Sequence, residues 1–390
     1  MWYTPAQAFM REHAIDAWLV HDFRSSNPIL AALLPGKRFL TRRVGLVIPA
    51  RDEPSLIASH IDASSFKGVD VPLMKYLTWG EYRARLADAL RGVKRVAMEY
   101  SPGGDLPVVG IADAGTVELV RSFGPEVVTS ADLIQITVAR WSDAAVANHA
   151  RASHEVAGVK DGAFAFIRDS LAAGKAITEV DVQARMHEAF RRLGLEWPDG
   201  PIVAVNGHAG DPHFEPTPAN TSTIRKGDWV LIDLWARVPG DENIFSDITW
   251  VGCCGTPTER QVNVFHAVKA ARDAAVKIAR DRWASRAPVH GWEVDDAAMG
   301  ELRAAGFAEG IRHRTGHSLS PGPKVHGVGV NIDNTETHDT RRLLPGVGFT
   351  VEPGLYFSDF GVRLEINLHM DPAKGPTITS CVQDDILRLA

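Results

Sequence analysis

The sequence predicts a two-domain protein of the α/β class, with α+β character in its second part. Strand-like and helical segments alternate up to about residue 100, and from Ile202 onward strands are separated by glycine-rich turns. The chain has 390 residues, which is enough for two domains of ordinary size. We therefore expect a domain boundary near residues 130–145, where a long helical zone begins.

The first part begins with a helical stretch at residues 5–14, and residues 80–90 also have helical spacing. Several short runs rich in Val, Leu and Ile are typical of strands. These predicted strands cover residues 17–21, 43–50, 54–59 and 95–100.

The second part begins with a predicted helix at residues 142–172, which has an apolar stripe along one side. A second helix is expected between Thr178, a suitable N-cap, and Gly194, a suitable C-cap. Two further helices are predicted at residues 259–285 and 293–305.

The composition is that of an ordinary globular protein, with 45% hydrophobic and 23% charged residues. The formal net charge is -6 with both signs interspersed, so neither nucleic acid nor an anionic membrane is expected as a partner. No apolar run reaches the ~20 residues that span a bilayer, and the charged N-terminal stretch is unlike a secretory signal. The three cysteines, Cys253, Cys254 and Cys381, predict reduced thiols and a cytoplasmic location.

Acidic residues occur where strands should bury hydrocarbon. Asp233 follows the apolar run 230–232, and Asp247 lies in a second half-apolar run, although burying an ionised carboxylate is costly unless something compensates for it. His317, Glu352 and Glu365 lie in similar strand-like or glycine-bounded contexts. Two divalent ions about 3.5–4 Å apart would neutralise such a set. Carboxylates with one histidine suit Mn, Co, Fe or Zn.

Each of these residues alone is weak evidence, because a single Asp at a strand end is usually a turn former or a helix cap. Their order and flanking sequences carry more information: "VLID", "SDITWV", "RTGHSL", "FTVEPGLYF" and "GVRLEINLHM". In these stretches the chain resembles the M24 pita-bread metallopeptidases, which include aminopeptidase P, prolidase and methionine aminopeptidase, with creatinase as a metal-free relative.

The resemblance covers the whole chain. It implies a creatinase-like N-terminal α/β domain at residues 1–140 and a pita-bread catalytic domain at residues 141–390. The N-terminal domain favours the proline-specific branch over methionine aminopeptidase. The resemblance also implies a cytoplasmic enzyme that forms a homodimer.

The metal ligands implied by the resemblance are Asp233 for one ion, His317 and Glu352 for the other, and Asp247 and Glu365 as bridges between them. Glu352 would also be the general base that takes the proton from a metal-bridging water as this water attacks the scissile carbonyl.

Further substrate-facing residues are implied by the same comparison. His213 would contact the substrate or the leaving nitrogen, His326 would grip the proline side and stabilise the intermediate, and His313 would face the substrate. Arg363 would bind the substrate carboxylate or orient Glu365.

The chain departs from the family pattern at several positions. Trp235 stands two residues after Asp233, where a small residue is usual, and should narrow the pocket if it is not simply packed in the core. The segment "NIFS" lacks the usual Tyr before Asp247, so a phenol hydroxyl near the metals is not expected. Trp250 replaces a common Arg, and His326 is followed by Gly327. His369 alternates with Glu365, but a structural role is favoured for it.

These features together predict an exopeptidase with two divalent ions, manganese first and Co, Zn or Fe as alternatives. Its substrate would be a small peptide with proline at the second position, and we favour an Xaa-Pro dipeptidase. Aminopeptidase P, acting on longer peptides, is the alternative within the branch. A creatinase-like enzyme and a non-catalytic binding protein are less consistent with five retained ligands. A C–S lyase of the same fold would carry an extra Asp two positions after the first ligand, where this chain has Trp235.

Overall fold

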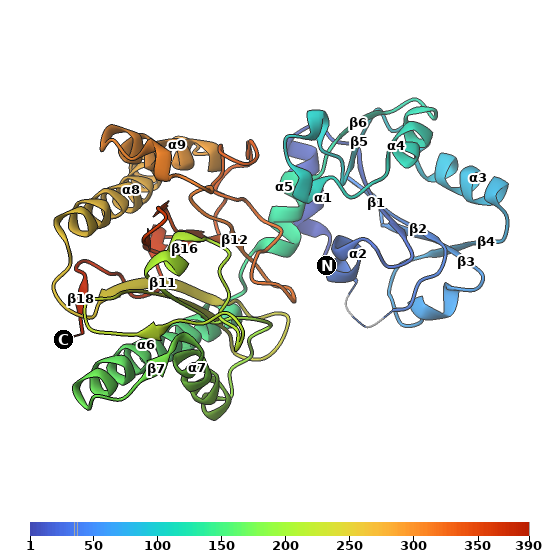
Figure 1. Ribbon diagram of the computed structural model, residues 1–390. Coiled ribbons are helices and arrows are strands. Elements are labelled where there is room, and N and C mark those ends of the chain that lie inside the picture. The colour runs from blue at the N-terminus through green and yellow to red at the C-terminus, as the bar shows by residue number, and fades with distance from the viewer. Residues whose placement is uncertain (35, 37, 390) are drawn as a thin grey trace. The chain divides into compact units, whose positions relative to one another are not determined.

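The computed structural model describes residues 1–34, 36 and 38–389, and the chain divides into two compact units, Met1–Ala139 and Arg140–Ala390 (Figure 1). Both units contain helices and β-sheets, so the expected α/β class is confirmed. The creatinase-like and pita-bread assignments of the two domains stay predictions. Within the described ranges, none of the helices has the length and apolar character needed to cross a membrane.

The first unit is built on a mixed six-stranded sheet in the order β4-β3-β2-β1-β5-β6. The central strand β1 runs antiparallel to β2 and parallel to β5, and it is buried along most of its length. The strands are β1 (Ala17–Phe23), β2 (Arg43–Pro49), β3 (Ser55–Ser59), β4 (Leu73–Tyr76), β5 (Arg95–Met98) and β6 (Glu126–Thr129). The helices are α1 (Thr4–Glu12), α2 (Pro28–Leu33), α3 (Trp79–Ala89), α4 (Ala114–Arg121) and α5 (Ala131–Ile134).

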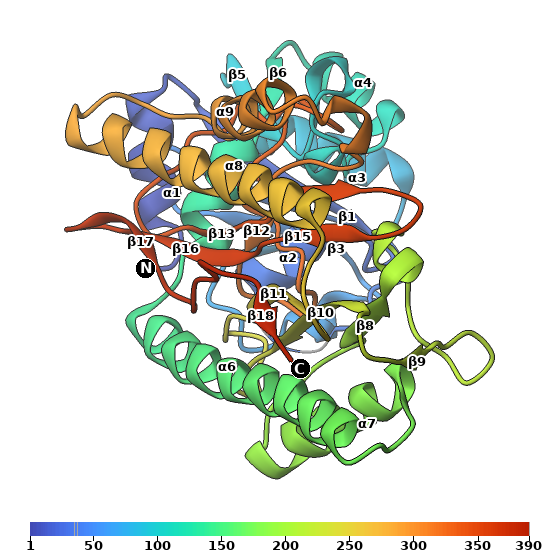
Figure 2. The same cartoon turned by 60° about the vertical axis from the view of Figure 1, so that its left-hand side comes forward.

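The second unit is layered, with one helix pair on each side of two small sheets (Figures 1 and 2). Helices α6 (Asp143–Ala172) and α7 (Glu179–Leu193) cover one sheet, and α8 (Glu259–Ala284) and α9 (Gly291–Ala304) cover the other. The first sheet has the order β18-β11-β10-β8, and the second has the order β12-β13-β16-β17.

The strands of the first sheet are β8 (Ile202–Val205), β10 (Trp229–Ala236), β11 (Ser246–Cys253) and β18 (Leu387–Arg388). Those of the second sheet are β12 (Ser318–Leu319), β13 (Gly348–Val351), β16 (Ile366–Asp371) and β17 (Gly375–Ile378). Two short pairs complete the unit: β14 (Gly354–Tyr356) with β15 (Gly361–Arg363), and β7 (Ile177–Thr178) with β9 (Thr223–Ile224).

Local signals define the ends of the helices in the second unit. The Thr178 hydroxyl accepts a hydrogen bond from the backbone N–H of Asp181, whose carboxylate accepts the N–H of Thr178, so the two residues form a capping box. The other end of α7 stops at Gly194, which has a φ of 65°, a left-handed conformation that glycine adopts without steric cost. Both predicted caps of this helix are therefore confirmed.

Strand β10 is buried on both faces. The alternation of its side chains between the two faces determines the direction in which Asp233 points. Val230, Ile232 and Leu234 belong to the hydrophobic core beneath α6 and α7. The residues of opposite parity, Trp229 and Leu231, belong to the core on the α8 and α9 side. Because side chains alternate along a strand, Asp233 and Trp235 point towards the second sheet. The same rule turns Asp247 on the neighbouring β11 in that direction, since Trp235 and Asp247 are paired in register.

Candidate metal centre

A cavity of about 950 Å³ lies in the second unit, and all the predicted site residues line it. Asp233 and Asp247 come from the first sheet, whereas the remaining ligands come from segments around the second sheet. His317 directly precedes β12, Glu352 follows β13, and Glu365 lies in the break between β15 and β16. The other predicted residues on the wall are His213, His313, His326 and Arg363.

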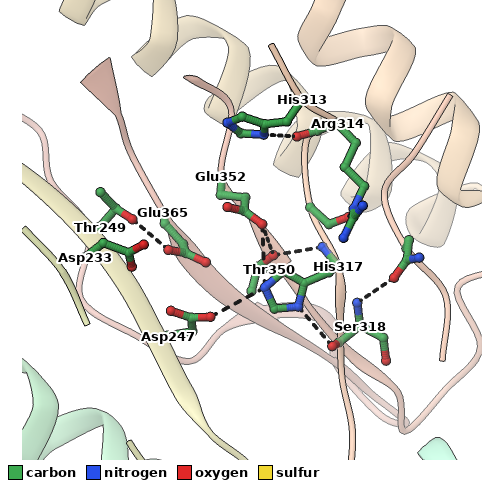
Figure 3. A network of polar contacts seen from close by, with 12 residues as sticks. Asp233, Asp247, Thr249, His313, Arg314, His317, Ser318, Thr350, Glu352 and Glu365 are labelled. Atoms are coloured by element: carbon green, nitrogen blue, oxygen red, sulfur yellow. Dashed lines mark hydrogen bonds and ion pairs between the residues drawn. The ribbon is translucent and has the colours of Figure 1, made fainter. Parts of the chain in front are cut away.

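The predicted ligands face one another across this space (Figure 3). Potential ligand atoms of Asp247, His317 and Glu365 all lie within 4.8 Å of one another. His317 Nε2 is 3.4 Å from Asp247 Oδ2 and 3.6 Å from Glu352 Oε1, which is too long for good hydrogen bonds. The fold thus brings together the residues that the sequence predicted as ligands. Their roles as ligands stay a prediction.

The ring of His317 is oriented for an interaction through Nε2. Its Nδ1 lies 3.1 Å from the carbonyl oxygen of Ser318, and only a protonated Nδ1 can donate to that oxygen. This tautomer leaves the lone pair of Nε2 directed at the carboxylates. The backbone N–H of His317 is also fixed, because it donates to Thr350 Oγ1 at 2.9 Å. A histidine held through its other nitrogen is the usual arrangement of a metal ligand.

Within the residues that the structure describes, Arg363 is the one cationic side chain buried among these acids. Its Nη2 donates to Asp233 Oδ2 at 2.5 Å, and its Nε donates to Thr249 Oγ1 at 3.0 Å. The Thr249 hydroxyl in turn donates to Glu365 Oε2 at 2.8 Å. Arg363 is 5% exposed, and these bonds favour the orienting role predicted for it over direct binding of a substrate carboxylate.

Burial and mutual repulsion dominate the protonation behaviour of three of the acids. Burial raises the pKa of Asp233, of Asp247 and of Glu365, and the neighbouring carboxylates raise the pKa values of these groups further. Glu352 differs. Burial acts to raise its pKa, but His317, His313 and Arg363 together outweigh this effect and lower the pKa.

The donor set fits divalent cations. Three buried carboxylates and the partly buried Glu352 face the buried guanidinium of Arg363, so the cluster carries excess negative charge when the acids are ionised. Asp233 Oδ1 is buried and has no hydrogen-bond partner within the described ranges of the chain. An unpartnered buried oxygen is costly unless a cation or water satisfies it. Oxygen-rich ligation with one imidazole matches the preference of Mn²⁺ and related ions.

The predicted histidines occupy different parts of the cavity. His326 packs on His317 with ring centroids 3.9 Å apart, and the charge of His317 followed by burial lowers the pKa of His326 to about 3. His313 Nε2 lies 2.7 Å from the Tyr356 hydroxyl. His213 is exposed on the wall, and its backbone N–H donates to Asp211 Oδ1 at 3.0 Å.

Tyr356 corrects one expectation from the sequence. A phenol hydroxyl was not expected beside the site, because the segment before Asp247 lacks tyrosine. The short hairpin of β14 and β15 brings Tyr356 there instead, and its hydroxyl accepts from Arg363 Nη1 at 2.7 Å. Burial raises the pKa of this hydroxyl to about 12, so it stays protonated. Tyr356 lies in the stretch "FTVEPGLYF", but strands as short as β14 and β15 give no pattern that would show its hydroxyl turning towards Arg363.

Trp235 and Trp250, the two tryptophans that depart from the family pattern, lie on opposite faces of the first sheet. Trp235 lines the cavity, and its Nε1 donates to Asp199 Oδ1 at 2.9 Å. Trp250 belongs to the face covered by α6, where the ammonium of Lys160 lies 3.4 Å from the centroid of its ring. Trp250 therefore does not enter the metal pocket, whereas Trp235 does.

A comparison with protein families decides the relationship of the chain. Residues 147–372 match the metallopeptidase family M24. The chain belongs to this family. The resemblance seen in the sequence is thereby confirmed, and the match includes all five predicted ligands of the M24 site.

Curated relatives within the family are dipeptidases by name. The chain is 30% identical over 215 residues to the putative dipeptidase YkvY of Bacillus subtilis, covering 55% of this chain and 54% of the relative. It is 27% identical over 208 residues to an Xaa-Pro dipeptidase of Lactobacillus helveticus, covering 52% and 49%. These matches span about half the length of both relatives. The probable dipeptidase PepE of Mycobacterium tuberculosis is 26% identical over 331 residues, covering 83% and 80%.

Solved structures share the fold over the whole chain. Dipeptidase PepE from Mycobacterium ulcerans has a TM-score of 0.73 at 22% identity, covering 100% of this chain and 97% of that one. The Xaa-Pro dipeptidase from Bacillus anthracis has a TM-score of 0.65 at 17% identity, covering 99% and 98%. The X-prolyl aminopeptidase of Caenorhabditis elegans, described as having a di-nuclear active site, has a TM-score of 0.64 at 17% identity, covering 97% and 61%.

Proposed function

We propose that this M24 protein is an Xaa-Pro dipeptidase that works with two divalent metal ions, manganese first. The observation that carries the proposal is the convergence of Asp233, Asp247, His317, Glu352 and Glu365 on one buried cavity. The names of the Lactobacillus helveticus and Bacillus anthracis relatives support the substrate class. The homodimer, the cytoplasmic location and the identity of the metal stay predictions.

The ions would be held by Asp233 on one side and by His317 and Glu352 on the other, with Asp247 and Glu365 shared. Bound divalent ions polarise a carbonyl and lower the pKa of water. Glu352 is the carboxylate best suited to accept a proton, because it alone among the four acids has its pKa lowered. Its Oε1 also accepts from Thr350 Oγ1 at 3.2 Å, which fixes the direction of the carboxylate.

The remaining residues would position the substrate. Arg363 holds Asp233 directly and Glu365 through Thr249, so it keeps ligands from both sheets in register. His313 lies on the wall and is held by the buried Tyr356 hydroxyl, so we assign His313 the binding of the carbonyl or leaving-group side and Tyr356 the positioning of His313. His326, kept neutral beside His317, would donate one hydrogen bond to the carboxylate of the substrate proline.

Hydrolysis of Ala-Pro, Ala-Pro-Ala and Ala-Ala tests the proposal, with Mn, Co and Zn each added separately to metal-free protein. We expect release of alanine from Ala-Pro to be the fastest of the three reactions. Faster cleavage of Ala-Pro-Ala would instead identify an aminopeptidase, and equal cleavage of Ala-Ala would remove the proline preference.

A further inference from the structure

Asp199 is an acid on the rim of the metal cavity that no ligand assignment uses. It lies in the loop between α7 and β8 and lines the same cavity as the five predicted ligands. Its carboxylate is exposed, and Oδ1 accepts a hydrogen bond from Trp235 Nε1 at 2.9 Å. Within the described ranges Asp199 has no cationic side chain as a partner, so its charge is available to a ligand.

Trp235 fixes Asp199 relative to the metal ligands. The indole rests on Gly200, where an added Cβ would lie only 2.6 Å from the ring, so the loop and the indole are in close contact. Gly200 also has a φ of 64°, which a larger residue rarely adopts. Trp235 is in turn paired with Asp247 across β10 and β11. Burial, Asp233 and Glu352 raise the pKa of Asp247, and the charge of Asp199 adds to that rise.

The charges on the rim of the cavity are separated, with an acid on the side of the first sheet and bases on the side of the second sheet. Asp199 precedes β8 of the first sheet, whereas Arg312 and Lys324 flank the β12 segment of the second sheet and also line the cavity. The third cation there, Arg314, is neutralised by Glu336 at 2.7 Å. Neither Arg312 nor Lys324 is ion-paired in the described part of the chain. A short peptide with free ends is itself a dipole, so its amino end is attracted to Asp199 and its carboxyl end to the two cations.

We propose that Asp199, held in place by Trp235, is a cation-binding position for the amino-terminal residue of the substrate. This inference rests on the proposed peptidase function. The group bound by Asp199 would be an ammonium or a guanidinium near the scissile bond. Two parts of the substrate can supply such a group: the α-ammonium of every dipeptide, and the side chain of a lysine or arginine at the first position.

The variants D199N and W235F test the proposal, with E301Q as the control. Asn keeps the size of Asp199 and removes its charge, and Phe keeps the aromatic ring of Trp235 and removes its N–H donor. Glu301 is an exposed acid of α9 that does not line the cavity. The substrates are Lys-Pro, Leu-Pro and Ala-Pro, and propionyl-proline, which lacks the α-ammonium, is measured as a competitive inhibitor.

We expect D199N to lower kcat/KM for Lys-Pro about three- to five-fold, mainly through KM, because the ion pair is exposed to solvent. W235F should cause a smaller loss of the same kind, and E301Q none. A loss of kcat/KM that is confined to Lys-Pro would show that Asp199 binds the lysine side chain. An equal loss for all three dipeptides, with inhibition by propionyl-proline unchanged, would show that Asp199 binds the α-ammonium. Raising the salt concentration should reduce the effect in either case.

The proposal is overturned if D199N has the same kcat/KM as the parent enzyme on every dipeptide. It is also overturned if inhibition by propionyl-proline weakens as much as dipeptide binding does, because that result indicates a structural defect. Calorimetric binding of Lys-Pro to metal-free protein separates this test from the proposed function. If no dipeptide is hydrolysed, the peptidase proposal fails, whereas a D199N-dependent dissociation constant still supports the site.

Discussion

The protonation of Glu352 distinguishes it from the acids around it. Three of the four carboxylates have raised pKa values because burial and mutual repulsion favour their neutral forms. Glu352 faces His317 at 3.6 Å, and the charges of His317, His313 and Arg363 lower its pKa, which favours the carboxylate form that a general base requires. The same cavity therefore contains acids suited to hold cations and one acid suited to accept a proton.

Replacing Glu352 by glutamine should lower kcat for Ala-Pro about 10²-fold or more, which is the usual contribution of a general base. The amide keeps the size of the side chain but cannot accept the proton. Steady-state hydrolysis at saturating metal measures the effect, with E301Q as the control. A variant with more than half of the parental kcat would show that Glu352 is not the base.

Replacing Trp235 by glycine should raise cleavage of Phe-Pro relative to Ala-Pro about ten-fold, because a pocket contact of this size contributes ~1–3 kcal/mol to discrimination. The indole lines the cavity and packs on Gly200, so its removal opens the wall. The ratio of the two kcat/KM values is the measurement. If this ratio stays the same, Trp235 is a packing residue only.

Single residues could be predicted where a motif surrounds them and not otherwise. The flanking sequences predicted that the five proposed ligands would lie at one site with His213, His313, His326 and Arg363, and all of them line one cavity. Asp199 was missed because no motif surrounds it, and the stretch that contains Tyr356 indicated only Glu352. Their positions depend on contacts such as Trp235 with Asp199, which join residues distant in the sequence.

At the scale of elements, the side-chain amide of Asn367 links two strands that belong to different sheets. Asn367 on β16 accepts from the backbone N–H of Asp247 on β11 at 3.0 Å, and its Nδ2 donates to the backbone carbonyl of Asp247 at 2.5 Å. Asn367 is completely buried. The position of Asp247, a predicted shared ligand in the first sheet, is thus set by a side chain of the second sheet.

Replacing Asn367 by alanine should destabilise the protein by about 2–4 kcal/mol, because two buried backbone groups lose their partners. Metal affinity should also fall about 10–100-fold, as is usual when a residue that positions a ligand is removed. Denaturant unfolding and metal titration measure the two effects, and Asn334, an exposed amide, provides the matched control N334A. Unchanged metal affinity in N367A would contradict this role of the inter-sheet contact.

Long helices were predictable and very short strands were not. The helix predicted from Thr178 to Gly194 has both expected caps, and α6 and α8 match their predicted ranges to within one residue. Strands such as β7, β12 and β14 have two or three residues, which is too short for any alternation to be recognised. Glu365 was expected within a strand but lies in a break, where its backbone N–H donates to the carbonyl of Thr249 on β11.

At the scale of the whole molecule, burial of histidines makes stability depend on pH. His149 on α6 is 1% exposed, packs against Trp141 and contacts Thr379 Oγ1 at 2.8 Å. Burial lowers its pKa from 6.5 to about 4. The unfolded chain therefore binds the proton more tightly, so the stability contribution is present above pH 6.5 and is lost as the pH falls towards 4.

Between pH 7 and pH 5, this one group should reduce the free energy of unfolding by about 2 kcal/mol. The variant H149Q lacks the titrating ring and should lose correspondingly less stability over the same range. Denaturant unfolding of metal-free protein at both pH values is the measurement. Equal losses in the two proteins would mean that His149 does not titrate as its burial predicts.

The composition and the order of the motifs predicted two domains and the family, and the family is confirmed over residues 147–372. They could not predict how the two sheets are joined. That feature depends on packing between segments more than 100 residues apart, such as Asp247 with Asn367, and no local pattern encodes such a contact.

The stoichiometry and affinity of divalent metal binding test the central claim most directly. Metal-free protein titrated with Mn²⁺ should take up about two ions per chain, and D247N, which alters a shared ligand, should lose affinity for both ions together. If the parent protein binds no divalent ion, or if D247N binds as the parent does, the buried acids have another purpose and the proposed chemistry is wrong.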